Sequence, residues 1–153
     1  MSVKTCCVTG HRDIPADKLE YVKGELQREI LQSIEDGYTH FISGFAEGVD
    51  LLFASIVADL MKSNPALTLE AALSYRNRMN TTDRLFRWLL PKCKTIGVHS
   101  EKYSPTCYIK CYREMVLQSQ RIIAVYDGRE KGGTLFTMRY AYTQGREVRV
   151  IKT

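Results

Sequence analysis

The stretch HFISGFAEGVDLLFASIVADL, residues 40–60, decides the fold class because it joins two kinds of secondary structure. Its first four residues are strand-like, and from Leu52 onward apolar residues recur at helical spacing. Gly44 and Gly48 lie at the junction, where the backbone must turn tightly or another group must approach it closely. We therefore predict a strand over residues 40–43 that leads directly into a helix, the unit from which parallel sheets are built.

The same order of strand and helix repeats along the rest of the chain. Strands are expected where apolar residues run together, and helices where apolar residues recur every three or four positions. The expected strands are residues 3–9, 40–43, 67–73, 95–98, 121–126 and 148–151. The expected helices are residues 16–36, 52–60, 82–90, 105–120 and 133–144. The alternation predicts an α/β, three-layer Rossmann-like fold, a mostly parallel sheet flanked by helices on both faces, as a single domain over residues 1–153.

Composition excludes several classes of protein. The chain has 153 residues, of which 44% are hydrophobic and 25% charged, so it can bury a core without disulfides. No apolar run approaches the ~20 residues that span a bilayer, so we expect no membrane association. The start MSVKTCCVTG lacks signal-peptide organisation, and an odd number of cysteines (five) fits a reducing compartment, which together favour the cytoplasm. Cys107 and Cys111 have no second metal-ligand pair beside them, so we expect no metal and no cofactor.

Three glycine-containing loops follow the first, second and fifth expected strands, and they read VTGHRD, SGFAEGVD and YDGREKGGT. In parallel sheets ligands bind beyond the carboxyl ends of the strands, near the point where strand order reverses. We therefore expect the three loops to lie together and to form a ligand site. The candidate ligand-binding residues, most of them in these loops, are Gly10, His11, Arg12, Ser43, Gly44, Glu47, Gly48, Asp50, Arg76, Asp127, Gly132, Gly133 and Thr134.

Each residue type in these loops has a functional and a structural interpretation. Helix starts favour anions, and Arg12 offers a bidentate phosphate contact, which together with a net charge of +5 suits an anionic ligand. The glycines are equally explained as steric solutions to strand–helix turns. Asp50 either complements the helix dipole or orients a ribose hydroxyl, and Asp127 either orients a ribose or caps a turn. His11 is favoured as a hydrogen-bond donor or structural residue over an acid/base group. The loops contain neither of the usual nucleotide fingerprints.

The motifs VTGHR, ISGFAEGVD and KGGTLFTMRYAYTQGREV resemble the SLOG superfamily of Rossmann-like domains. The best-known branches of that superfamily are the DNA-processing protein A domain and the LOG cytokinin-activating phosphoribohydrolases. With YSPTCYIKCYREMV before RIIAVYDG, the layout of nearly the whole chain most resembles the YpsA branch of small stand-alone bacterial proteins. The resemblance implies a pocket for a nucleotide or nucleotide-derived ligand, with its phosphate over Ser43, Gly44, Gly132, Gly133 and Thr134.

The chain departs from the LOG and YpsA patterns in informative ways. The LOG branch carries P-G-G-x-G-T-x-x-E, whose Glu supports N-glycosidic cleavage, whereas here Lys131 replaces the Pro and no Glu follows in the stretch Thr137–Arg139. Glu47 is the alternative acid, although a solvated carboxylate in a first helical turn is the favoured interpretation. The YpsA branch tends to carry Arg-Asn where this chain has Cys111 and Tyr112.

These observations rank three functions. The first is a cytosolic sensor or regulatory module that binds a nucleotide-type small molecule, and the alternative is a LOG-like nucleotide N-glycosidase. Single-stranded DNA binding comes third, because tyrosines and basic loops permit it but the chain has no continuous Lys/Arg run. Whether the protein is an enzyme therefore stays open, and the LOG resemblance implies a homo-oligomer. Arg76 is expected near a distal phosphate or base, and Tyr75, Tyr103, Tyr108 and Tyr112 offer stacking surfaces.

Overall fold

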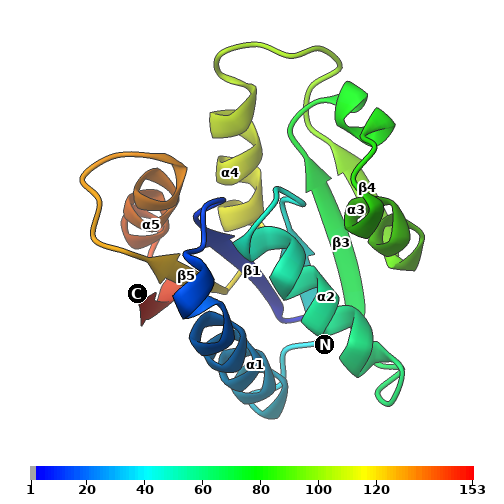
Figure 1. Ribbon diagram of the computed structural model, residues 1–153, viewed down its shortest axis with the longest axis vertical. Helices are drawn as coiled ribbons and strands as arrows, with labels where there is room; N and C mark the ends of the chain where they lie inside the picture. The colour runs from blue at the N-terminus through cyan, green and yellow to red at the C-terminus, as the bar shows by residue number, and fades with distance from the viewer. Residues whose placement is uncertain (1–2) are drawn as a thin grey trace.

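The computed structural model describes residues 3–153, which form one parallel sheet with helices packed on both of its faces (Figure 1). The strands are β1 (Thr5–Gly10), β2 (His40–Ser43), β3 (Thr68–Leu73), β4 (Thr95–Val98), β5 (Arg121–Tyr126) and β6 (Glu147–Lys152). The helices are α1 (Leu19–Glu35), α2 (Val49–Met61), α3 (Arg84–Leu89), α4 (Cys107–Leu117) and α5 (Gly133–Thr143). The predicted three-layer α/β fold is confirmed. The first two residues of the expected domain, and of the N-terminal stretch used to favour the cytoplasm, lie outside the described residues.

The central strands are apolar on both sides because a layer of helices covers each face of the sheet. In β3, Leu69, Ala71 and Leu73 belong to one apolar cluster, while Ala72 belongs to a second cluster on the opposite face. The first face is covered by α1, α2 and α3, and the second by α4 and α5 (Figure 1).

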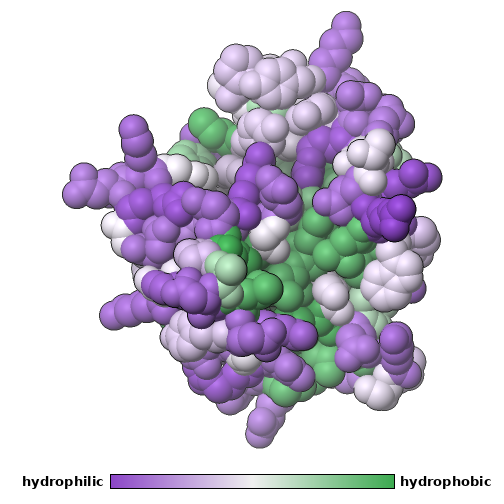
Figure 2. Space-filling model, in the orientation of Figure 1, coloured by the Kyte–Doolittle hydropathy of each residue, from purple (hydrophilic) through white to green (hydrophobic). Residues whose placement is uncertain are grey.

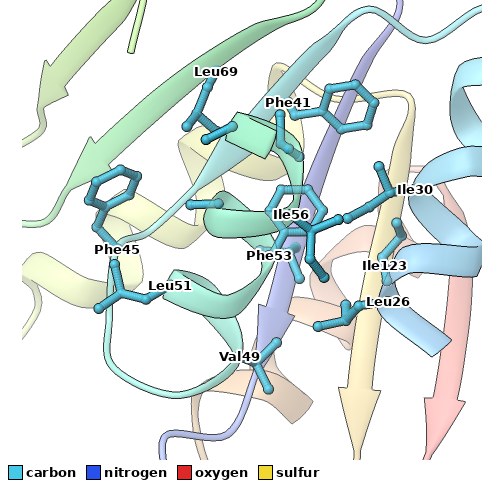
Figure 3. Packing of buried hydrophobic residues seen from close by; sticks show 14 of the residues in the cluster. Leu26, Ile30, Phe41, Phe45, Val49, Leu51, Phe53, Ile56, Leu69 and Ile123 are labelled. Carbon is cyan, nitrogen blue, oxygen red and sulfur yellow. The ribbon is translucent and has the colours of Figure 1, made fainter. Parts of the chain in front are cut away.

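The larger core lies between the sheet and helices α1 and α2 (Figure 3). Leu26 and Ile30 of α1 lie beside Ile123 of β5. Phe41 of β2 and Phe53 of α2 belong to the same cluster, and none of these five side chains is exposed to solvent. The rings of Phe41 and Phe53 have centroids 6.1 Å apart. Complete burial of each such side chain contributes about 1.5–3 kcal/mol, so this core fixes the position of α2 and of the loop that precedes it.

The order of the strands brings the loops that were expected to form a site to one edge of the sheet. The order in the sheet is β4-β3-β2-β1-β5-β6, and every pairing is parallel. The chain moves outward from β1 to β4, then returns to the other side of β1 with β5. The switch point therefore lies between β1 and β5, and the loops after β1, β2 and β5 share one edge of the sheet.

Boundaries of the elements differ from expectation at the starts of the first two helices. The expected helix over residues 16–36 begins with a 3₁₀ turn, Ala16–Lys18, before α1. Helix α2 begins at Val49, earlier than the apolar pattern indicated, because Gly48 ends the loop with φ 83°. Within residues 3–153, the helices are too short or too polar to span a bilayer.

Candidate functional site

A cavity of about 630 Å³ opens at the carboxyl end of β1, at the switch point of the sheet. Its wall is built from the loop after β1, the start of α2, the start of α5 and one face of α4. The candidate residues that line it are Gly10, His11, Arg12, Asp50, Gly132, Gly133 and Thr134. The structure therefore brings residues of all three predicted loops to one cavity.

The loop after β1 supplies an imidazole and a cation. Nε2 of His11 lies 3.2 Å from the backbone N of Asp127, which donates a hydrogen bond to it. Burial lowers the pKa of His11, which favours the neutral ring that can accept this bond. His11 thus connects the loops after β1 and β5.

Arg12 is the cation of this loop, and its guanidinium is not neutralised by a carboxylate. The guanidinium lies over the ring of Tyr108, 5.6 Å from the ring centroid. None of the ion pairs among residues 3–153 involves Arg12. A positive charge that lines a cavity without an ionic partner in the protein is available to an anionic ligand.

In the loop after β2, the candidate residues Ser43 and Gly44 make contacts within the protein itself. The hydroxyl of Ser43 donates to the carbonyl oxygen of Asp50 at 2.8 Å and accepts from the backbone N of Phe45 at 3.2 Å. A Cβ on Gly44 would lie 2.8 Å from Oδ2 of Asp50. Both Ser43 and Gly44 are buried and neither lines the cavity, so the structure does not place them under a phosphate as the resemblance implied.

The absence of a side chain at Gly48 leaves room for another segment of the backbone, the loop after β1. A Cβ at this position would lie 2.6 Å from the carbonyl oxygen of Arg12 and 2.7 Å from that of His11. The backbone N of Val49 donates to the same carbonyl of His11 at 3.3 Å. Both interpretations of Gly48 are observed, because its backbone turns with φ 83° and the loop after β1 approaches it closely. A Cβ on Gly10 would likewise meet the side chain of Val49 at 2.4 Å.

Asp50 places a buried carboxyl in the cavity wall. Its Oδ2 accepts a hydrogen bond from the backbone N of Ala46 at 3.3 Å. Burial raises the pKa of Asp50 from 3.8 to about 7, and the hydrogen bond from Ala46 together with the charges of Arg78 and Arg12 opposes the rise only in part. The carboxyl group therefore exchanges its proton near neutral pH. Glu47, the other acid of this loop, is exposed and lines a second cavity instead.

The loop before α5 forms the part of the wall best suited to an anion. Gly132 precedes the helix with φ 119°, a conformation open to glycine, and Gly133 begins it. The first amides of a helix lack intrahelical partners and lie at the positive end of its dipole. Thr134 is buried and also lines the cavity, so all three residues of this segment form part of its wall.

The last two candidate residues, Asp127 and Arg76, also lie away from this cavity. Asp127 is bound by the guanidinium of Arg129, which holds the pKa of that carboxyl down at about 2, and it borders a smaller cavity of about 160 Å³ on the side of α1. Arg76 forms an exposed ion pair with Glu101, with Nη2 and Oε1 2.8 Å apart. Neither residue lines the large cavity. Figure 2 shows the strongly hydrophilic surface over the segment between β5 and α5 that carries Asp127 and Arg129.

A known protein family matches nearly the whole of this chain. The family model described as the YspA SLOG family (YpsA) matches residues 6–151. The chain belongs to the YpsA SLOG family.

Proteins of the UPF0398 group are similar to this chain. Those of Ligilactobacillus salivarius, Bacillus pumilus and Enterococcus faecalis are 26%, 25% and 24% identical over 125, 154 and 152 aligned residues. The matches cover 78%, 91% and 91% of this chain and 68%, 82% and 84% of the respective relatives.

Two solved structures share the fold. TM1055, a structural genomics target, aligns with a TM-score of 0.62 and 16% identity over 95% of this chain and 72% of its own. DNA processing protein A from Helicobacter pylori, studied for its single-stranded DNA binding mode, aligns with a TM-score of 0.67 and 15% identity. That match covers 96% of this chain and 64% of the other, so this chain spans less than two thirds of that protein. At such identities the likeness is one of fold.

In this YpsA-family chain α4 also lines the cavity, and of its lining residues only Tyr108 and Tyr112 were named from the sequence, as stacking surfaces. Tyr108, Ile109, Tyr112 and Met115 line the wall, at positions that lie on one face of a helix. Burial raises the pKa of Tyr112 to about 12, and a Cβ on Gly133 would lie 3.0 Å from its ring. The sequence showed that these residues share one face of a helix, but it did not show that this face lines the cavity.

The structure shows where the residues lie at which this chain departs from the YpsA and LOG patterns. Cys111 is buried, with its Sγ 3.4 Å from the carbonyl oxygen of Ala72, so it packs in the core while Tyr112 faces the cavity. Thr137 lines the cavity, and its hydroxyl donates to the carbonyl oxygen of Gly133 at 2.8 Å. Counted from Lys131, the Glu of the LOG pattern falls at Arg139, which is exposed and does not line this cavity. Among residues 3–153, no group of three or more His, Cys, Asp or Glu side chains is arranged to hold a metal ion.

Proposed function

We propose that this YpsA-family protein binds a nucleotide or nucleotide-derived ligand in the large cavity and acts as a sensor or regulatory module. The observation that carries the proposal is the start of α5, Gly132–Thr134, which shares one cavity with the unpaired guanidinium of Arg12. Free amides at a helix start and a planar cation are the groups that proteins commonly use for phosphate.

The rest of the cavity suits the remainder of such a ligand. Its volume of about 630 Å³ lies within the range typical of small-molecule sites. Tyr112, Met115 and Phe136 give the wall an apolar and aromatic side against which a base can pack. Binding rather than turnover is the primary proposal because the stretch Thr137–Arg139, where the LOG pattern ends in its Glu, contains no carboxylic acid.

A thermal-shift panel of nucleoside monophosphates tests the proposal. A nucleotide supplied at about one hundred times its Kd should raise the Tm by about 5 °C or more. Gly133→Asp should abolish the shift, because the new carboxylate repels phosphate and its Cβ meets Tyr112 at 3.0 Å. Arg12→Ala, which removes no ion pair, should reduce the shift strongly.

Gly24→Asp is the matched control, because Gly24 is exposed on α1 with no heavy atom near its Cβ position. It should keep the full ligand-induced shift. Equal shifts in wild type and Gly133→Asp would overturn the proposed site, and no shift with any nucleotide would overturn the proposed function.

A second candidate function is hydrolysis of a nucleotide N-glycosidic bond, and Asp50 is the observation that favours it. A carboxyl group whose pKa is about 7 can both donate and accept a proton near neutral pH. Incubation with nucleoside monophosphates should then release free base and ribose phosphate, and Asp50→Asn should stop the release. Absence of release by wild type across the panel removes this candidate and leaves binding as the function.

A further inference from the structure

We infer that a second cavity, next to the first, binds another part of the same ligand, so that the ligand has two ring-containing units joined by a diphosphate. This inference rests on the proposed function. The second cavity has a volume of about 400 Å³ and shares Arg12, Ala46 and Tyr108 with the first. Two cavities with a common wall can hold two halves of one molecule.

The second cavity is more polar than the first and is built on the segment after β3. Its wall carries the side chains of Asn77, Asn80 and Thr81, which offer amide and hydroxyl groups to a sugar or to the edge of a base. Tyr75 gives it an aromatic wall and packs edge-on against Tyr108, with ring centroids 6.3 Å apart.

Arg78 fixes the boundary between this cavity and the loop after β2. Its guanidinium donates to the carbonyl oxygens of Gly44 and Phe45, each at 2.7 Å. Phe45 has φ 57°, unusual for a residue with a side chain, and its ring packs edge-on against Phe86. These contacts use N–H groups of Arg78 but leave its charge without a carboxylate partner. The guanidinium whose donors are free for a ligand is therefore that of Arg12.

The location of Arg12 between the two cavities indicates that a diphosphate joins the two units of the ligand. Its side chain borders both cavities, and its planar fork can contact two phosphate oxygens at once. A diphosphate beside Arg12 would extend from the start of α5 toward the second cavity. One guanidinium with free donors, together with the carboxylates of Glu47 and Asp83 in the second wall, suits a small diphosphate ligand better than the repeated charges of a polynucleotide.

Calorimetric titration with AMP, diadenosine diphosphate and a short single-stranded oligodeoxynucleotide tests the inference. Wild type should bind diadenosine diphosphate at least tenfold more tightly than AMP. Asn77→Trp fills the second cavity from an exposed position and should bring the ratio of the two affinities close to one. Met79→Trp is the matched control on the same 3₁₀ turn, lies outside both cavities, and should keep the ratio.

The outcomes separate the two claims. AMP binding without an advantage for the dinucleoside, or an advantage that persists in Asn77→Trp, overturns the second cavity as a subsite and leaves the first site intact. Tighter binding of the oligodeoxynucleotide than of diadenosine diphosphate overturns the small-ligand assignment. Absence of binding by both adenosine compounds overturns the proposed function together with this inference.

Discussion

Replacing Gly48 with alanine is expected to lower the free energy of unfolding by about 3 kcal/mol or more, as measured by urea denaturation. The backbone at Gly48 has φ 83° and ψ −127°, a conformation that residues with a Cβ rarely adopt. The added methyl group would also lie 2.6 Å and 2.7 Å from the carbonyl oxygens of Arg12 and His11. Relief of this overlap requires the loops after β1 and β2 to separate.

Gly24→Ala gives the matched control because the same chemical change occurs where space and conformation permit it. Gly24 lies within α1, and no heavy atom lies within 4 Å of its Cβ position. Alanine there should stabilise the protein by about 0.5–1 kcal/mol. If Gly48→Ala were as stable as wild type, the contact between the two loops would not have the geometry described.

Replacing Asp50 with asparagine is expected to stabilise the protein relative to wild type by an amount that grows with pH. The pKa of Asp50 rises from 3.8 to about 7 on folding, so the folded state holds a proton that the unfolded state releases. Between these values wild-type stability therefore falls as pH rises, and it reaches its full loss above pH 7. With about 1.4 kcal/mol for each pKa unit, the gap between the variant and wild type should widen by at most about 4 kcal/mol.

Urea denaturation of both proteins at pH values from 4 to 8 measures this gap. Contributions from other titrating groups, such as His11 and Asp127, occur in both proteins and cancel in the difference. The amide of asparagine keeps an oxygen that can accept the hydrogen bond from Ala46. A gap that stays constant across this pH range would contradict the raised pKa and remove the basis for Asp50 as an acid/base group.

The alternation of strands and helices was predictable because buried parallel strands and amphipathic helices have distinct apolar periods. The location of a site at one edge followed from the same pattern, since parallel strands bring their carboxyl ends together. The directions of individual side chains did not follow. Ser43 ends β2 but points into the turn, where it bonds to the backbone of Asp50 and Phe45.

The arginines after β3 show why neighbouring residues could not be distinguished from sequence. Arg76 and Arg78 lie in one 3₁₀ turn, Arg76–Asn80, where each residue rotates by about 120°. Arg76 therefore faces Glu101, while Arg78 reaches the loop after β2. Helix α4 was recognisable by its apolar face, but its location over the cavity depends on how α4 packs on the sheet beside α5.

Binding of a phosphate by the amides at the start of α5 can be followed in the backbone amide resonances of the ¹⁵N-labelled protein during titration with AMP. We expect large, saturable shifts for the amides of Gly132, Gly133 and Thr134, and strongly reduced shifts in Arg12→Ala at the same AMP concentration. Saturable shifts at another surface, with these three amides unchanged, would contradict this expectation.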